Sequence, residues 1–287
     1  MAILEVENVS KDLGDFALRD ISFKLDEGYI MGFIGPNGAG KTTTIKIIMN
    51  LMKKDKGKVR LFGLDYKGHE LEIKNRIGFV FDENYYYEEL TIKEMKKIIA
   101  PFYSNWDEDV FNDYIKKFSL PLNRKIKDLS KGMKMKFSLA VALSHNAELL
   151  VMDEPTSGLD PIVRDELLDI LSEFIQNENR AVFFSTHITS DLDKIADYIT
   201  FINEGRILFS STKEELWDNY VLVKGDKALL DGKLKNSMVG FRENRFGFTG
   251  IGFYEKIMAL ELKDRLVLEK PTLEDIMLYF GRRGDNV

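Results

Sequence analysis

Residues 29 to 43, YIMGFIGPNGAGKTT, contain the part of the sequence that decides the fold. The opening stretch, YIMGFI, is an apolar run typical of a buried parallel strand, and a glycine-rich turn ends it abruptly. The residues after the turn favour a helix, so the order is strand, glycine-rich loop and helix. This order predicts an α/β fold with a mostly parallel sheet.

The glycine-rich turn matches the P-loop pattern, in which glycines let backbone N–H groups turn inward around a phosphate group. The helix after the loop offers its positive end to the same anion. Lys41 is expected to place its ammonium group on the β- and γ-phosphate oxygens, and the Thr42 hydroxyl is expected to bind Mg²⁺. The predicted nucleotide contacts of the loop are Gly35, Pro36, Asn37, Gly38, Ala39, Gly40, Lys41, Thr42 and Thr43.

A second buried strand, expected over residues 148–152, runs into two carboxylates, Asp153 and Glu154. A parallel neighbour of the first strand would deliver both side chains beside the P-loop. Asp153 is expected to hold Mg²⁺ through its water. Glu154 is the candidate general base that deprotonates the water attacking the γ-phosphate.

The segment Leu129-Ser130-Lys131-Gly132-Met133 precedes a predicted helix and resembles the LSGGQ signature of ABC ATPases. Over about residues 1–215 the motifs follow that family's order, from P-loop and signature through Asp-Glu and Ser157-Gly158-Leu159-Asp160 to Ser185-Thr186-His187. The resemblance implies an ATP hydrolase in which two such domains enclose two ATP molecules.

The same resemblance implies roles for further residues. Ser130 and the Gly132 N–H would contact the γ-phosphate bound on the second subunit, and Asp160 would couple the two sites. His187 would contact the γ-phosphate and act with Glu154 and Lys41 as a catalytic residue.

Three features depart from the family pattern. Asp82 stands where a glutamine is usual, and its carboxylate could approach Mg²⁺ or its water. In the signature, Lys131 replaces the first glycine and adds positive charge beside the γ-phosphate, while Met133 replaces glutamine. Leu13 occupies the place of an aromatic residue that stacks on adenine, with Phe16 shortly after it, so contact with the base and strict preference for ATP over GTP stay open.

The rest of the chain divides into recognisable regions. Alternating residues predict antiparallel edge strands over 3–9 and 18–25, and the spacing of apolar residues predicts helices over 131–144 and 161–176 and a strand over 181–185. These belong to an ATPase domain over residues 1–217 with an inserted helical subdomain at about 88–145. Residues 218–287 are expected to form a small α+β accessory domain, whose last helix would begin with a capping box of Thr272 and Asp275.

The amino-acid composition limits the kinds of partner and site that the protein can have. The chain of 287 residues is 44% hydrophobic and 31% charged, as expected for a folded globular protein, and its net charge of −6 disfavours nucleic acid. It contains no cysteine, which excludes disulfides and thiolate sites. No apolar stretch approaches the ~20 residues that span a bilayer. We therefore expect a cytoplasmic subunit, peripheral on the inner face of the cell membrane, that works with a separate membrane-spanning permease.

The expected partners are that permease and a second ATPase subunit, in a homo- or heterodimer. Residues 82–90, DENYYYEEL, are a candidate docking surface because their three tyrosines cannot all face one core; the alternative is one buried tyrosine with two at its rim. The ending PTLEDIMLYF, residues 271–280, resembles that of ABC-2-type exporter ATPases and favours export. The alternative function, a soluble ABC-type ATPase acting on nucleic acid or ribosomes, predicts tandem ATPase domains, a long heptad insertion or a basic arm, and the sequence shows none of these.

Overall fold

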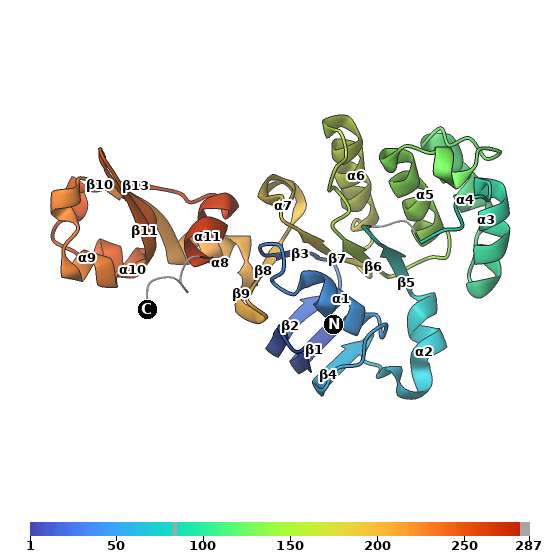
Figure 1. The fold of residues 1–287 in the computed structure, drawn as a ribbon, viewed down its shortest axis with the longest axis horizontal. Helices are drawn as coiled ribbons and strands as arrows, with labels where there is room; N and C mark the ends of the chain where they lie inside the picture. The colour runs from blue at the N-terminus through green and yellow to red at the C-terminus, as the bar shows by residue number, and fades with distance from the viewer. Residues whose placement is uncertain (83–84, 282–287) are drawn as a thin grey trace.

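The computed structural model describes residues 1–82 and 85–281, and its central element is a six-stranded sheet of order β5-β6-β7-β3-β8-β9 (Figure 1). Neighbouring strands pair in parallel, except for the antiparallel edge pair of β8 and β9. The predicted mostly parallel α/β core with an antiparallel edge is therefore confirmed. The strands are β3 (Ile30–Ile34), β5 (Ile77–Val80), β6 (Leu149–Asp153), β7 (Ala181–Thr186), β8 (Tyr198–Asn203) and β9 (Arg206–Thr212).

A separate antiparallel sheet covers one face of this core. It has the order β2-β1-β4 and consists of β1 (Ala2–Asp12), β2 (Ala17–Asp26) and β4 (Lys56–Leu61). Its buried face packs on the central sheet through aromatic rings, with Phe23 5.6 Å from Phe33 and 5.4 Å from Phe183 between ring centroids. Both predicted edge strands are present, and each is longer than its alternating pattern indicated.

Helices surround the central sheet, and three of them gather at the end of the molecule farthest from the C-terminal unit (Figure 1). These three are α3 (Ile92–Ile99), α4 (Glu108–Lys117) and α5 (Lys131–Leu143). The predicted helices over 131–144 and 161–176 are present but end earlier, at Leu143 and Phe174. The predicted first core strand begins at Ile30, because Tyr29 is half exposed and packs edge-on against Tyr198. The remaining helices of this part are α1 (Lys41–Ile48), α2 (Tyr66–Asn75), α6 (Pro161–Phe174) and α7 (Thr189–Ile195), with single 3-10 turns at Ala100–Phe102 and Ile126–Asp128.

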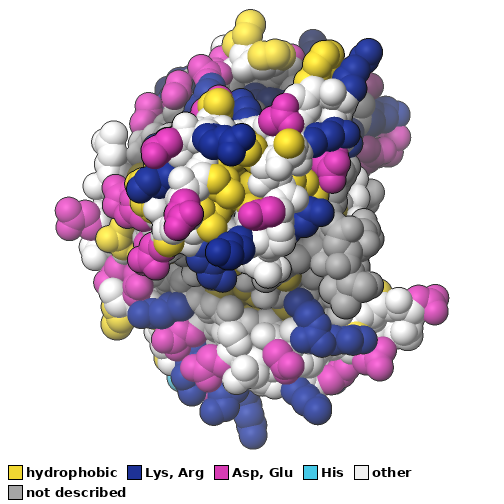
Figure 2. Space-filling view, turned by 90° about the vertical axis from the view of Figure 1, so that its left-hand side faces the viewer, with side chains coloured by type: hydrophobic (Ala, Val, Ile, Leu, Met, Phe, Trp, Pro, Cys, Tyr) yellow, Lys and Arg dark blue, Asp and Glu magenta, His cyan; other side chains and the backbone are white. Residues whose placement is uncertain are grey.

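The C-terminal unit is an antiparallel sheet of order β11-β12-β10-β13 with short helices on it. The predicted division between residues 217 and 218 falls inside α8, which continues directly into the first strand of this sheet. The face that this unit presents at the end of the molecule intersperses acidic and basic side chains around a small hydrophobic patch (Figure 2). Its elements are α8 (Lys213–Asn219), β10 (Tyr220–Gly225), α9 (Gly232–Asn236), β11 (Met238–Asn244), β12 (Gly247–Phe253), α10 (Tyr254–Met258), β13 (Val267–Glu269) and α11 (Leu273–Phe280), with 3-10 turns at Lys227–Leu229 and Lys263–Arg265.

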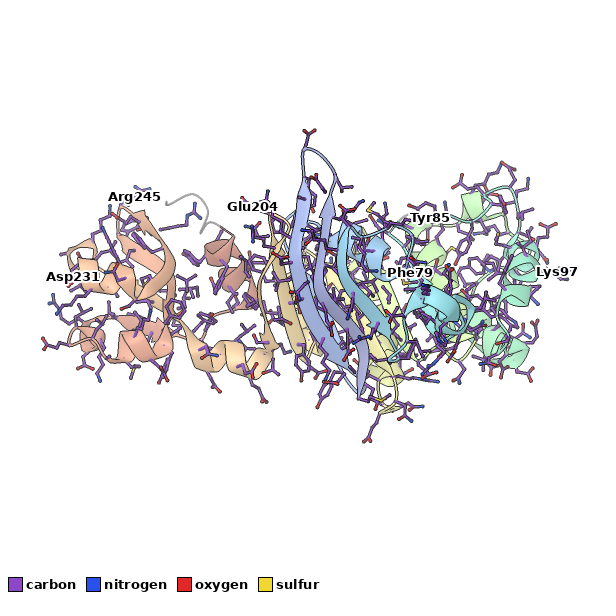
Figure 3. All side chains as sticks on the ribbon, turned by 90° about the horizontal axis from the view of Figure 1, so that it is seen from below. Phe79, Tyr85, Lys97, Glu204, Asp231 and Arg245 are labelled. Carbon is purple, nitrogen blue, oxygen red and sulfur yellow. The ribbon has the colours of Figure 1, made fainter. Side chains whose placement is uncertain are left out.

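The last helix, α11, returns from the C-terminal unit to the ATPase core. It begins with the predicted capping box, in which Thr272 and Asp275 exchange side-chain to backbone hydrogen bonds. At its other end, the Phe280 ring packs 5.2 Å from Phe209 and 5.2 Å from Tyr220 between centroids. The helix therefore ties the two parts of the chain together. In the view from below, Glu204 marks the β8–β9 turn between them, with Asp231 and Arg245 on one side and Tyr85 on the other (Figure 3).

Candidate nucleotide-binding site

The P-loop runs from the end of β3 to the start of α1, and its conformation requires glycine. Gly40 is the N-cap of α1 and has a left-handed φ of +111°, which side chains rarely adopt. A Cβ atom at this position would lie 2.5 Å from Leu18 Cδ2 and 3.0 Å from Phe16 Cζ. The loop is therefore packed tightly against the β1–β2 connection, which presses the Phe16 ring onto it.

The buried ammonium group of Lys41 lies inside the curve of this loop. It donates hydrogen bonds to the Gly35 carbonyl at 2.8 Å and the Pro36 carbonyl at 3.3 Å. It also forms an ion pair with Glu154 Oε1 at 3.2 Å. The loop thus holds a desolvated positive charge where a phosphate group would bind, which strengthens its attraction for anions.

Glu154 follows β6 in a strained conformation that its surroundings maintain. Its φ is +48°, and its N–H donates to the Ser185 carbonyl and hydroxyl oxygens, both at 3.1 Å. Its second carboxylate oxygen accepts a hydrogen bond from the His187 N–H at 3.3 Å and lies 2.8 Å from His187 Nδ1. The structure therefore brings the three predicted catalytic residues together, with the Glu154 carboxylate between Lys41 and His187.

Asp153 lies deeper in the site and pairs with hydroxyl groups. Ser185 Oγ donates to its carboxylate at 2.6 Å, and the Thr42 hydroxyl also hydrogen-bonds to it. Burial raises the pKa of Asp153, these two hydrogen bonds oppose the rise, and the negative charges of Glu154 and Asp82 add to it. Within residues 1–82 and 85–281, Asp153 has no ion-pair partner.

This donor set fits a magnesium ion. Carboxylate and hydroxyl oxygens are the ligands that Mg²⁺ prefers, and Mg²⁺ is commonly held by one or two such groups together with substrate phosphates. No cluster of three or more His, Cys, Asp or Glu residues in the described part of the chain could hold a metal by itself. A magnesium ion here would therefore arrive with the phosphates of its nucleotide.

Lys41, Thr42, Glu154 and His187 line one pocket of about 600 Å³. Phe16 lines the pocket and Leu13 does not; the Leu13 N–H donates to the Phe16 carbonyl, and the Leu13 side chain is 45% exposed. A second cavity of about 670 Å³ adjoins it and shares Phe16, Asn37 and Gly38 as lining residues. Pro36, Ala39 and Phe280 also line this second cavity. The residues lining the first pocket are Phe16, Asn37, Gly38, Gly40, Lys41, Thr42, Thr43, Asp82, Glu154, Ser157 and His187.

Ser130, Gly132 and Asp160 do not line this pocket, and Ser130 and Asp160 each cap a helix. Ser130 is the N-cap of α5, with its hydroxyl accepting from the Met133 N–H at 3.2 Å, and the helix then passes Gly132. Asp160 is the N-cap of α6 and accepts from the Ile162 and Val163 N–H groups. Contact of Ser130, Gly132 and Asp160 with a nucleotide on a second subunit stays a prediction.

Two features of the site were missed by sequence reasoning. Ser185 holds both Asp153 and the Glu154 backbone; its position opposite Asp153 in the β6–β7 register was the available signal. Asp82 forms an ion pair with Lys131 at 3.3 Å, which neither residue's place in the sequence predicts.

Of the three adjacent tyrosines, Tyr86 is partly buried against the core and the other two are exposed. Tyr86 packs 4.9 Å from Phe137 between centroids, and burial raises its pKa to about 12. Tyr85 and Tyr87 are 65% and 67% exposed. Glu83 and Asn84, in the same predicted docking segment, lie outside the described residues.

Comparison with known proteins places this site in a family. A family model described as "ABC transporter" matches residues 18–157. The chain is 32% identical over 209 residues to the bacitracin transport ATP-binding protein BcrA of Bacillus licheniformis, covering 72% of this chain and 68% of that protein. It is 32% identical over 229 residues to the lantibiotic transport ATP-binding protein SrtF of Streptococcus pyogenes, covering 77% of this chain and 98% of that protein.

Solved structures show the same similarity. One titled as the ATP-binding subunit of an ABC transporter superposes with a TM-score of 0.69 at 28% identity, covering 75% of this chain and 91% of that chain. Another, the ADP conformation of an ATP-binding cassette of an ABC transporter, gives a TM-score of 0.64 at 26% identity, with coverages of 75% and 92%. With these similarities, and with the P-loop lysine, Glu154 and His187 lining one pocket, the chain belongs to the ATP-binding subunits of ABC transporters and is an ATP hydrolase.

Proposed function

We propose that the chain binds Mg²⁺-ATP in the pocket lined by Lys41, Glu154 and His187, and that hydrolysis there powers an exporter in the cell membrane. The observation that carries this proposal is the position of the Glu154 carboxylate, which lies 3.2 Å from Lys41 Nζ and 2.8 Å from His187 Nδ1. Because Lys41 and His187 can both contact a phosphate, a carboxylate between them is well placed to orient a water molecule for attack on that phosphate.

The residues divide the chemistry among them. Lys41 and the P-loop N–H groups would bind and orient the phosphates, and His187 would hold the Glu154 side chain and contact the terminal phosphate. Thr42 and Asp153, with Asp82 nearby, would hold Mg²⁺, which when bound neutralises negative charge on the phosphates. Glu154 would take the proton of the attacking water.

Phe16 is the better candidate for contact with the base. It lines the pocket beside the P-loop, whereas Leu13 lies outside the lining residues. An aromatic ring provides a flat surface for stacking and does not distinguish purines by itself.

The names of two relatives support a role in transport. The two relatives described above are named for transport of bacitracin and of a lantibiotic. We propose that this chain likewise works with a membrane-spanning permease and a second ATPase subunit, at the inner face of the cell membrane, to move a lipophilic compound or peptide. The exposed Tyr85 and Tyr87 are candidates for the permease contact.

The helices of the described residues do not include one that is both long enough and apolar enough to cross a membrane.

The test of the proposed chemistry is the substitution Glu154→Gln. Glutamine keeps the shape of the side chain but cannot accept the proton, so we expect ATP binding to persist while turnover falls by about 10²–10⁴-fold. Binding would be measured by titration with a fluorescent ATP analogue and turnover by phosphate release.

A matched control is Glu148→Gln, because Glu148 precedes the same strand but pairs with Arg76 away from the pocket. That variant should hydrolyse ATP at the rate of the parent chain. Unchanged turnover in the Glu154 variant would exclude Glu154 as the base. Co-purification of the chain with ribosomes or nucleic acid, instead of a multi-span membrane protein, would contradict the transport proposal.

A further inference from the structure

Two residues that depart from the family pattern contact each other. Asp82 Oδ1 lies 3.3 Å from Lys131 Nζ, although the two residues are far apart in the sequence. Asp82 also lines the pocket that contains Lys41 and Glu154. The ion pair therefore has one partner in the candidate phosphate site and the other at the start of α5.

The start of α5 is an unfavourable place for a lysine. Lys131 is the first residue of the helix, and the first turn contains no acidic residue. Because the N-terminal end of a helix carries partial positive charge, a cation there is destabilising and a carboxylate is stabilising. Asp82 supplies the missing negative charge from another part of the chain. Its carboxylate therefore offsets both the partial positive charge of the helix end and the charge of Lys131.

The Lys131 side chain also reaches the turn before α6. A Cβ atom added to Gly158 would lie 3.3 Å from Lys131 Nζ and 3.5 Å from its Cδ, and Gly158 itself has a left-handed φ of +66°. Ser157, the residue before it, lines the phosphate pocket. Lys131 thus lies between two walls of the pocket, with Asp82 in one and the Ser157-Gly158 turn beside the other.

Further contacts fix the segment after Asp82 to the segment around α5. Glu88 pairs with Lys134 at 3.2 Å, and Glu89 pairs with Lys127 at 2.8 Å. Beside them the Ile126 N–H donates to the Leu90 carbonyl at 2.9 Å. Of these ion pairs only Asp82–Lys131 includes a residue that lines the phosphate pocket. A ligand that alters the position or charge of Asp82 in the pocket therefore acts directly on Lys131 at the start of α5.

We propose that the Asp82–Lys131 ion pair is a latch that opposes binding of a magnesium nucleotide and is released by it. The inference rests on the proposed function, because it requires Mg²⁺-nucleotide in the pocket that Asp82 lines. The Asp82 carboxylate faces two cations, the Lys131 ammonium in the free subunit and the metal ion that enters with the phosphates, and it cannot neutralise both fully. The charge of Asp82 already acts within the metal-binding part of the site, since it contributes to the raised pKa of Asp153.

Nucleotide binding and formation of the ion pair are thermodynamically linked, so each must affect the other by the same factor. If bound Mg²⁺-nucleotide weakens the ion pair, then removing the ion pair must strengthen binding of Mg²⁺-nucleotide by the same factor. This gives an expectation opposite to that of simple charge attraction, in which loss of a lysine near a phosphate site weakens binding. Whether loss of Lys131 strengthens or weakens nucleotide binding therefore distinguishes the latch from simple charge attraction.

The experiment is a titration of the full chain with a fluorescent ADP analogue and Mg²⁺, comparing the parent with Lys131→Met. ADP is used so that hydrolysis does not change the ligand. The pair is half exposed on both sides, at 48% for Lys131 and 41% for Asp82. We therefore expect Lys131→Met to tighten binding by about two- to fivefold. The same substitution in an Asp82→Asn background should cause no tightening, and neither should Lys131→Met when EDTA replaces Mg²⁺.

Lys134→Met is the matched control. It makes the same change of charge and side chain on the same helix, but Lys134 pairs with Glu88, which does not line the phosphate pocket. Its affinity should equal that of the parent. Unchanged or weaker binding by Lys131→Met, or equal tightening by Lys134→Met, would overturn the latch. Absence of nucleotide binding by the parent chain would instead overturn the proposed function on which the latch depends.

A second measurement needs no nucleotide. In a double-mutant cycle on urea unfolding with Asp82→Asn, Lys131→Met and the double variant, the ion pair predicts that the two single effects do not add. Additive effects would show that the pair does not form in solution and would also overturn the latch.

Discussion

At the residue scale, three oxygen atoms of the protein hold the Lys41 ammonium group. Its contacts with the Gly35 and Pro36 carbonyls and with Glu154 keep a buried charge in place before a nucleotide binds. A cation fixed in this way loses little side-chain entropy when phosphate oxygens arrive. Lys41 therefore contributes to affinity more than an exposed lysine would.

Replacing Lys41 by alanine should weaken nucleotide binding by about tenfold or more, because charge-assisted hydrogen bonds to phosphate are lost. The measurement is a titration with a fluorescent ATP analogue. Lys46→Ala, on the same helix but outside the pocket lining, is the control and should bind normally. Normal affinity in the Lys41 variant would count against the P-loop as the binding site.

The residues whose position could be predicted are those fixed by a local motif. Glu154 directly follows β6, and the P-loop that ends in Gly40 and Lys41 follows β3, so the parallel sheet decides their approach to one another. The Asp82–Lys131 pair could not be predicted, because it depends on the folding of a long intervening segment and replaces the residues that the family pattern describes. Likewise, only the fold shows that Phe16, not Leu13, faces the pocket.

At the scale of single elements, the end of α5 is fixed by a buried histidine. His145 stacks on Tyr103 at 3.8 Å between ring centroids, and its two ring nitrogens lie 3.1 Å from the Val141 and Ile77 carbonyl oxygens. Burial lowers the pKa of His145 below its ordinary value of 6.5, against the opposing effect of the two carbonyls. The side chain joins α5 to β5.

This lowered pKa predicts a loss of stability in mild acid. Below pH 6.5 the unfolded chain takes up a proton at this residue while the folded chain resists it, so the free energy of unfolding falls as pH decreases toward the folded-state pKa. Urea unfolding at about pH 7.5 and about pH 5.5 would measure the effect. His145→Gln should lose stability less steeply between these two conditions than the parent.

His69→Gln is the matched control, because His69 is exposed and pairs only with Glu72. It should keep the pH dependence of the parent chain. A His145 variant with the full parental pH dependence would show that other groups cause it.

Element boundaries followed from sequence where a clear signal marks them. Asp160 followed by Pro161 marks the start of α6, and Thr272 with Asp275 marks the start of α11. The ends of α5 and α6 were predicted too late, because no glycine or proline stands at those positions. The separation of the β1-β2-β4 sheet from the central sheet could not be predicted, since alternating strands have the same pattern in either sheet.

At the scale of the whole molecule, α11 makes the C-terminal unit part of the ATPase core. Its buried residues, including Leu273, Ile276 and Phe280, belong to the same hydrophobic cluster as Phe201 of β8. The change of composition near residue 217 predicted a separate unit. The return of its last helix could not be predicted, because an apolar pattern shows that a helix is buried but not what covers it.

Phe280→Ala should cost about 3–5 kcal/mol of unfolding free energy, the usual cost of removing a buried phenylalanine ring. Urea unfolding of the full chain would measure it. Phe246→Ala provides the control, since Phe246 is 85% exposed, and its effect should stay within about 0.5 kcal/mol. Similar small effects in both variants would mean that α11 does not support the core.

The position of α11 also affects the order in which parts of the protein can fold during synthesis. Chains emerge from the ribosome N-terminus first, and domains commonly fold as they appear. Here the surface of β8 and β9 that receives Phe280 stays uncovered until residue 280 has been synthesised, well after both strands are complete. During translation the ATPase part of the chain therefore carries an uncovered apolar patch on β8 and β9, and a truncated or stalled product would keep this patch. Quality-control proteases and chaperones could recognise unfinished subunits by that patch before they reach a partner.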